Sequence, residues 1–170
     1  MMFNIRAMTI QDLAAVESVQ AEAYAGYFLE SADVIAQRFH SSPSTAWVAE
    51  KEGTVCAYLV GYRSKIGKIN PLNAPFNVVE ETNCLYLHDL ALLKSAQGAG
   101  LGRKLVQAAN EYAKSESVAA VALLSVQNSK EFWQGLGFAE FSDLEHCQQE
   151  NLRTYLTDDE SAFYMVKSFS

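Results

Sequence analysis

Apolar residues recur at two spacings along this chain, and each spacing predicts a different kind of element. Between Thr9 and Ala25 they are three or four positions apart, which places them on one face of a helix. The same spacing, with glycine or proline near several ends, predicts helices at residues 9–25, 31–42, 100–114 and 129–136. Alternating or unbroken apolar runs predict strands at residues 3–8, 46–51, 54–62, 84–93, 118–126 and 162–169, and another that begins at Phe138.

The order of these elements predicts how a sheet is built. Only Glu52 and Gly53 separate two of the strands, so these strands form a hairpin and are antiparallel neighbours. Residues 118–126 are almost entirely apolar and follow strand 84–93 through a helix, as in a right-handed βαβ unit with parallel strands. Residues 63–83 lack a period and form a lid, a binding loop or a disordered segment. A polar loop rich in glutamine and glutamate is expected before the last strand.

Composition and charge narrow the fold, the partners and the location. The 170 residues are expected to form one α/β domain, residues 1–170. The formal net charge of −7 disfavours nucleic acid, because neutralising phosphates requires a basic face. It mildly favours cationic substrates, although a solvated acidic surface is the more common explanation. No apolar run approaches the roughly 18 residues of a membrane span, so we expect a cytoplasmic protein with reduced cysteines, no membrane partner and no metal.

A glycine-rich turn between strand 84–93 and the following helix is the strongest chemical signal. Gly98, Gly100 and Gly102 precede a helix, and freed backbone N–H groups at a helix start can bind an anion. A dinucleotide fingerprint needs its third glycine at the position of Arg103, and a Walker A loop needs Lys-Ser/Thr after Gly102, where Arg103-Lys104 stands. Both nucleotide sites are excluded by spacing. The alternative is a tight turn without a ligand.

Two motifs resemble one known family. Gln97-Gly98-Ala99-Gly100-Leu101-Gly102 is similar to the pyrophosphate loop of the GNAT superfamily of acyl-CoA-dependent N-acyltransferases, and the segment from Phe132 to Phe138 resembles a second motif of that family. The resemblance implies a GNAT-like α/β fold, with a mixed, mostly antiparallel central sheet flanked by helices. It also implies acetyl-CoA as cofactor, bound where strands 84–93 and 118–126 separate.

The same resemblance implies which residues bind the cofactor. Backbone N–H groups from Gln97 to Gly102 would bind the pyrophosphate, and backbone groups near Leu90 and Leu92 would pair with the pantetheine arm and stabilise an oxyanion. Asn128 and Ser129 lie where the family places side chains near that arm, with simple helix caps as the alternative. The implied set is Leu90, Ala91, Leu92, Gln97, Gly98, Ala99, Gly100, Leu101, Gly102, Arg103, Asn128, Ser129, Phe132 and Trp133.

The catalytic residues are expected on strand 84–93. An alkyl amine has a pKa of roughly 10.4, so a base must remove its proton before it attacks. Strand alternation predicts that Tyr86 and His88 share one face with Leu90 and Leu92, and that Asp89 lies on the other. The family's usual carboxylate falls on Tyr86, so His88 is the candidate base, directly or through water, with a purely structural role as the alternative. Asp89 is the next candidate.

A second departure from the family is Trp133, which stands where many members have a tyrosine that protonates the leaving thiolate. An indole N–H cannot deliver that proton. Water or another tyrosine, such as Tyr164, would replace it. Leaving the thiolate unprotonated at neutral pH costs only about 2 kcal/mol for a thiol of pKa roughly 8.5.

The acceptor side is expected near the bend between the first two helices. Tyr24, Tyr27 and Glu30 would form an aromatic and acidic pocket for a cationic amine, unless they only pack or face solvent. The predicted activity is acetyl transfer to a primary amine, either a small molecule or a peptide N-terminus, by direct attack in a ternary complex. No cysteine or serine lies in a nucleophile arrangement. The alternative function is a catalytically silent acyl-CoA-binding sensor or interaction module. The sequence leaves the oligomeric state open, and a homodimer is one option.

Overall fold

The computed structural model describes residues 3–24, 28–157 and 161–169 and contains one mixed sheet of seven strands. Their order across the sheet is β1-β2-β3-β4-β5-β7-β6. Every neighbouring pair is antiparallel except β4 with β5, which is parallel. The strands are β1 (Asn4–Ala7), β2 (Ala46–Lys51), β3 (Thr54–Ser64), β4 (Cys84–Leu92), β5 (Ala120–Ser125), β6 (Ala139–Glu140) and β7 (Phe163–Ser168). The predicted mostly antiparallel sheet is therefore confirmed.

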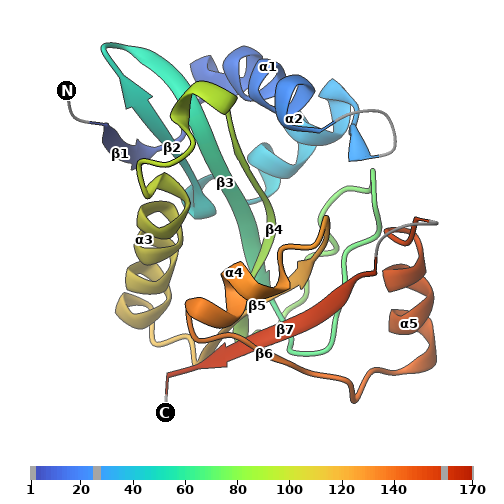
Figure 1. Cartoon of the computed structure of the whole chain (residues 1–170). Coiled ribbons are helices and arrows are strands. Elements are labelled where there is room, and N and C mark those ends of the chain that lie inside the picture. The colour runs from blue at the N-terminus through green and yellow to red at the C-terminus, as the bar shows by residue number, and fades with distance from the viewer. Residues whose placement is uncertain (1–2, 25–27, 158–160, 170) are drawn as a thin grey trace.

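Helices cover both faces of the sheet (Figure 1). One face packs against α3 and α4 in a core that contains Leu105 and Trp133. On the opposite face, α1 and α2 cover one half, and the segment between β3 and β4 covers the other half together with α5. The helices are α1 (Leu13–Ala23), α2 (Ala32–Ser41), α3 (Leu101–Ser115), α4 (Lys130–Gly135) and α5 (His146–Arg153). Among the described residues, no helix has the length and apolar character needed to cross a lipid bilayer.

Helix α5 lies in the segment that the sequence predicted to be a polar loop, so that expectation is wrong. None of its residues is buried, and apolar periodicity therefore gave no signal. Its polar side chains instead form hydrogen bonds with backbone groups of the segment between β3 and β4. Gln148 accepts from Ile69 N–H at 2.7 Å, and Asn151 donates to Ile69 O at 2.9 Å. Thr154, just after the helix, accepts from Leu72 N–H at 3.1 Å.

A β-bulge in β4 changes the direction of its side chains. Val60 of β3 is opposite Asp89, and the next β3 residue, Gly61, is opposite Leu87, so His88 is an extra residue in β4. The predicted alternation is wrong for this reason. Leu90 and Leu92 pack with Leu87 on the α3 face, whereas Asp89 and His88 both bond to groups on the α1 and α2 face.

Gly61 at this bulge leaves no room for a side chain. A Cβ atom there would lie 2.4 Å from the Tyr86 carbonyl oxygen. We expect Gly61→Ala to lower the free energy of unfolding by about 1–3 kcal/mol, the range for overpacking. Thermal denaturation should show a Tm lower by roughly 2–4 °C per kcal/mol. Gly135→Ala is the control, because a Cβ there meets nothing within 4 Å. Equal Tm values for the two variants would contradict this account of the bulge.

Candidate active site

A cleft opens where β4 and β5 separate. Their parallel pairing begins with Cys84 beside Ala120, and the last pair in the described structure is Leu87 beside Leu123. Beyond it lies a cleft of about 170 Å³, lined mainly by residues of β4, β5, the segment after β5 and α4. The opening expected between these strands is therefore present.

The β4 edge of this cleft offers backbone hydrogen-bonding groups. Leu93 N–H donates to Cys56 O at 2.8 Å, towards β3. Because alternate residues of a strand direct their N–H groups to opposite sides, those of Leu90 and Leu92 point to the side that β5 has left. An extended ligand in the cleft can pair with them as a strand would. The Tyr24 hydroxyl already lies at this edge, 3.0 Å from Leu90 O.

The turn before α3 has the features of a phosphate site. Gly98 and Gly100 have φ of +86° and +74°, a conformation that favours glycine. Lys104 N–H donates to Gly100 O at 3.1 Å as the first helical bond, so the N–H groups of the preceding residues in the first turn have no intrahelical acceptor. Arg103 and Lys104 are exposed in the same turn. The free N–H groups, the positive helix end and two cations fit a bound phosphate.

His88 lines the cleft and is held by a buried ion pair. Its Nε2 lies 3.1 Å and 3.2 Å from the two carboxylate oxygens of Glu30. Arg38 of α2 donates to the same two oxygens at 2.7 Å and 2.6 Å. Burial by itself raises the pKa of Glu30, but His88 and Arg38 together outweigh burial and hold that pKa well below its usual range. Glu30 is therefore a carboxylate at neutral pH.

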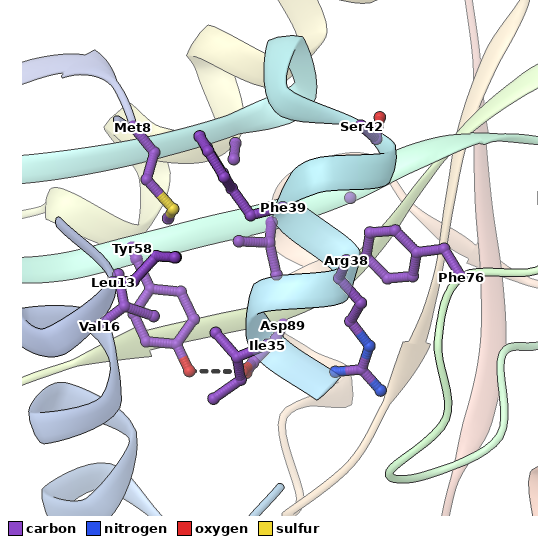
Figure 2. A pocket seen from close by; sticks show the side chains of 13 residues that line it. Met8, Leu13, Val16, Ile35, Arg38, Phe39, Ser42, Tyr58, Phe76 and Asp89 are labelled. Carbon is purple, nitrogen blue, oxygen red and sulfur yellow. Dashed lines mark hydrogen bonds between the residues drawn. The ribbon is translucent and has the colours of Figure 1, made fainter. Parts of the chain in front are cut away.

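Asp89 lies next to His88 and accepts hydrogen bonds from two tyrosines. The Tyr24 hydroxyl is 2.7 Å from one carboxylate oxygen, and the Tyr58 hydroxyl donates to the other. Figure 2 shows Tyr58 pointing towards Asp89. Burial raises the pKa of Asp89, while His88 and the two tyrosines oppose that effect. The cavity drawn in Figure 2 measures only about 20 Å³, room for roughly one water molecule.

Comparison with models of protein families identifies the family of this chain. The model described as the acetyltransferase (GNAT) family matches residues 13–138, which include the cleft, the glycine turn and His88. This chain belongs to the GNAT acetyltransferase family. Members of the family use acetyl-CoA, whose phosphates fit the features of the turn before α3. A search among curated proteins finds no match to the sequence.

Solved GNAT structures share the fold at low sequence identity. The ribosomal-protein-S18-alanine N-acetyltransferase from Escherichia coli is 19% identical, with a TM-score of 0.71 and coverage of 99% of this chain and 95% of that chain. A GNAT acetyltransferase from Brucella melitensis in complex with acetyl-CoA is 18% identical, with a TM-score of 0.67 and coverage of 99% and 89%. The GphF GNAT-like decarboxylase in complex with isobutyryl-CoA is 15% identical, with a TM-score of 0.76 and coverage of 98% and 100%. Identities this low show the shared fold alone.

The structure brings several of the predicted residues of this GNAT domain together. Seven of them line the cleft: Tyr24, His88, Asp89, Leu90, Ser129, Phe132 and Trp133. Tyr86 and Tyr164 are instead buried in the core beneath the β3–β4 segment and do not line it. The Tyr164 hydroxyl accepts from Gly67 N–H at 2.8 Å. Asn128 is exposed beside the cleft, and Tyr27 lies outside the described residues.

Other cleft and site residues of the GNAT domain were missed by sequence reasoning. Leu59, Leu124, Val126 and Gln127 also line the cleft. The apolar ones lie in predicted strands, so their strand positions were available but their exposure to a ligand was not. Arg38 was predicted only as a helix residue, and a buried arginine gives no local signal that it pairs with Glu30.

Proposed function

We propose that this protein transfers the acetyl group of acetyl-CoA to a primary amine by direct attack in a ternary complex. The observation that supports this most strongly is His88, which lines the β4–β5 cleft and has one ring nitrogen without a partner in the described part of the chain. The proposal treats residues 1–170 as one catalytic domain, with the glycine turn and the cleft as the cofactor side.

Each part of the site has a role in this proposal. Acetyl-CoA would supply an acetyl group activated as a thioester. The amine nitrogen would form the new C–N bond, and CoA would leave as its thiolate when the C–S bond breaks. The backbone from Gln97 to Gly102 binds the pyrophosphate, and the Leu90 and Leu92 edge orients the pantetheine arm. His88 Nδ1 accepts the proton that the amine loses. Asp89 and Tyr24 lie beside the reacting groups and orient them.

The amine enters through a smaller cavity that adjoins the cleft. It measures about 30 Å³ and shares Tyr24, His88 and Asp89 with the cleft. Phe28, Leu72 and Tyr155 contribute an aromatic and aliphatic wall. We propose a peptide N-terminus or a small amine as the acceptor. The Escherichia coli enzyme named above, a ribosomal-protein-S18-alanine N-acetyltransferase, supports the first, since its acceptor is a protein.

Trp133 favours a second candidate function, a silent acyl-CoA-binding module. It is 7% exposed, packs edge-on against Phe132 and Phe138, and offers no hydroxyl to a leaving thiolate. A module of this kind would bind acetyl-CoA and turn over no amine. An acetyl-CoA assay with a panel of amines and peptides therefore separates the two functions.

We expect His88→Ala to lower kcat by about 10²–10⁴-fold, the usual contribution of a general base, and to remove one limb of the pH–rate profile. The affinity for CoA, measured by calorimetry, should change little, because His88 contributes no group to the phosphate site. His146→Ala is the matched control, since the His146 side chain is 79% exposed on α5. An unaltered rate and pH profile in His88→Ala would assign the base to another residue.

A further inference from the structure

We propose that Glu30 and Arg38 are positioning residues that hold His88 as the neutral tautomer with hydrogen on Nε2 and a lone pair on Nδ1. The use of that lone pair as a base rests on the proposed function. The tautomer itself does not, because it follows from contacts within the free protein. The two parts can therefore be tested separately.

The Glu30 carboxylate determines which nitrogen of His88 bears hydrogen. Its oxygens accept hydrogen bonds from both terminal nitrogens of Arg38 and, at 2.8 Å, from the backbone N–H of Asn73. An ionised carboxylate has only lone pairs to offer, so the nearby Nε2 must donate a hydrogen to it. The side chains of Arg38, Glu30 and His88 are 4%, 4% and 2% exposed, so water does not compete for these bonds.

The second ring nitrogen of His88 is left for a ligand. Among the described residues, buried Nδ1 has no hydrogen-bond partner. A buried polar atom without a partner is uncommon in a folded protein and calls for an explanation. His88 lines both the cofactor cleft and the smaller cavity of the acceptor side. In the proposed function, the Nδ1 lone pair accepts the proton of an incoming amine.

Arg38 fixes the carboxylate that His88 meets. Its two terminal nitrogens donate to the two Glu30 oxygens at 2.7 Å and 2.6 Å, which holds the carboxylate in place beside Nε2. Its own position is fixed by a bond from Nε to Ala74 O at 2.9 Å and by stacking over Phe76 at 5.4 Å. Arg38 thereby joins α2 and the β3–β4 segment to the candidate base.

Long-range ¹H–¹⁵N NMR of histidine-labelled protein without acetyl-CoA tests the tautomer directly. The His88 signals are assigned by their loss in His88→Ala. At neutral pH we expect Nε2 to bear hydrogen and Nδ1 to bear none. Hydrogen on Nδ1, as the other tautomer or as the imidazolium, would overturn the proposal. The tautomer is read from the unaltered protein, and the variant serves only to assign the signals.

Glu30→Gln tests whether the carboxylate is responsible. The amide can present either an acceptor or a donor to Nε2, so we expect a mixture of tautomers and a fall in kcat of about 10²-fold or more, with an unchanged KM for acetyl-CoA. Arg6→Gln is the control, because it breaks another bidentate arginine–carboxylate pair, with Asp12, outside the cleft. It should leave both the tautomer and kcat unchanged. A Glu30→Gln variant with the native tautomer and native kcat would contradict the positioning role. The predicted tautomer in a protein that acetylates no amine would instead refute only the proposed function.

Discussion

Gly100→Glu is expected to abolish CoA binding while the protein remains folded. The new carboxylate would lie at the start of α3, among the N–H groups that we assign to the pyrophosphate. Like charges brought together in an interface cost several kcal/mol, and about 3 kcal/mol is more than a hundredfold in Kd. Calorimetric titration with CoA measures the effect. Native affinity in this variant would contradict the phosphate assignment.

The backbone strain of this substitution needs its own control. Gly100 has φ of +74°, so any side chain there costs roughly 1–2 kcal/mol of stability. Gly53→Glu introduces the same side chain at φ of +80° in the β2–β3 turn, and in both places the Cβ meets nothing within 4 Å. The two variants should lose similar stability, and only Gly100→Glu should lose CoA binding. Loss of binding in both would mean that strain, and not charge, explains the result.

Arg38→Met is expected to lower the free energy of unfolding by about 3–5 kcal/mol, because it leaves the Glu30 charge buried without its main partner. At roughly 2–4 °C per kcal/mol, the Tm should fall by about 10 °C. Thermal denaturation followed by circular dichroism measures this. The double variant Glu30→Gln, Arg38→Met removes both charges and should recover part of the loss.

The exposed pair formed by Lys130 and Glu140 provides the comparison. Their atoms are as close as those of the buried pair, at 2.7 Å, but the side chains are 31% and 44% exposed. Glu140→Gln should change stability by less than about 1 kcal/mol, the usual limit for surface pairs. If Arg38→Met is as mild as Glu140→Gln, the Glu30 charge must be compensated by another group or lost by protonation.

Most of the sheet and the glycine turn could be predicted because their signals are local. The strand from Cys84 and the run from Val118 are predicted by their mainly apolar residues, and the turn by its three glycines. The bulge at His88 could not be predicted, because it depends on how β3 pairs with β4. Strand alternation applied across it grouped His88 with Leu90 and Leu92 and separated it from Asp89, whereas His88 and Asp89 lie on the same face.

The rest of the candidate site could not be predicted because it depends on polar contacts between residues far apart in the sequence. Glu30 was expected in an acceptor pocket with Tyr24, and both line the smaller cavity. The sequence did not predict that its carboxylate also bonds to Arg38, His88 and Asn73. The choice among these partners depends on where α2 crosses the sheet. The spacing of residues in the sequence does not predict where that crossing lies. The same is true of α5, whose bonds go to backbone groups far along the chain.

The bonds between the α5 region and the β3–β4 segment go to backbone groups of that segment. Its path therefore depends little on which side chains it carries. Thr154 accepts from the N–H of Leu72, while the Leu72 side chain lines the small cavity on the acceptor side. Any residue except proline supplies the same N–H. Position 72 can therefore be varied in size and polarity with the backbone bond retained. Under the proposed function, this makes it a starting point for changing which amines are accepted.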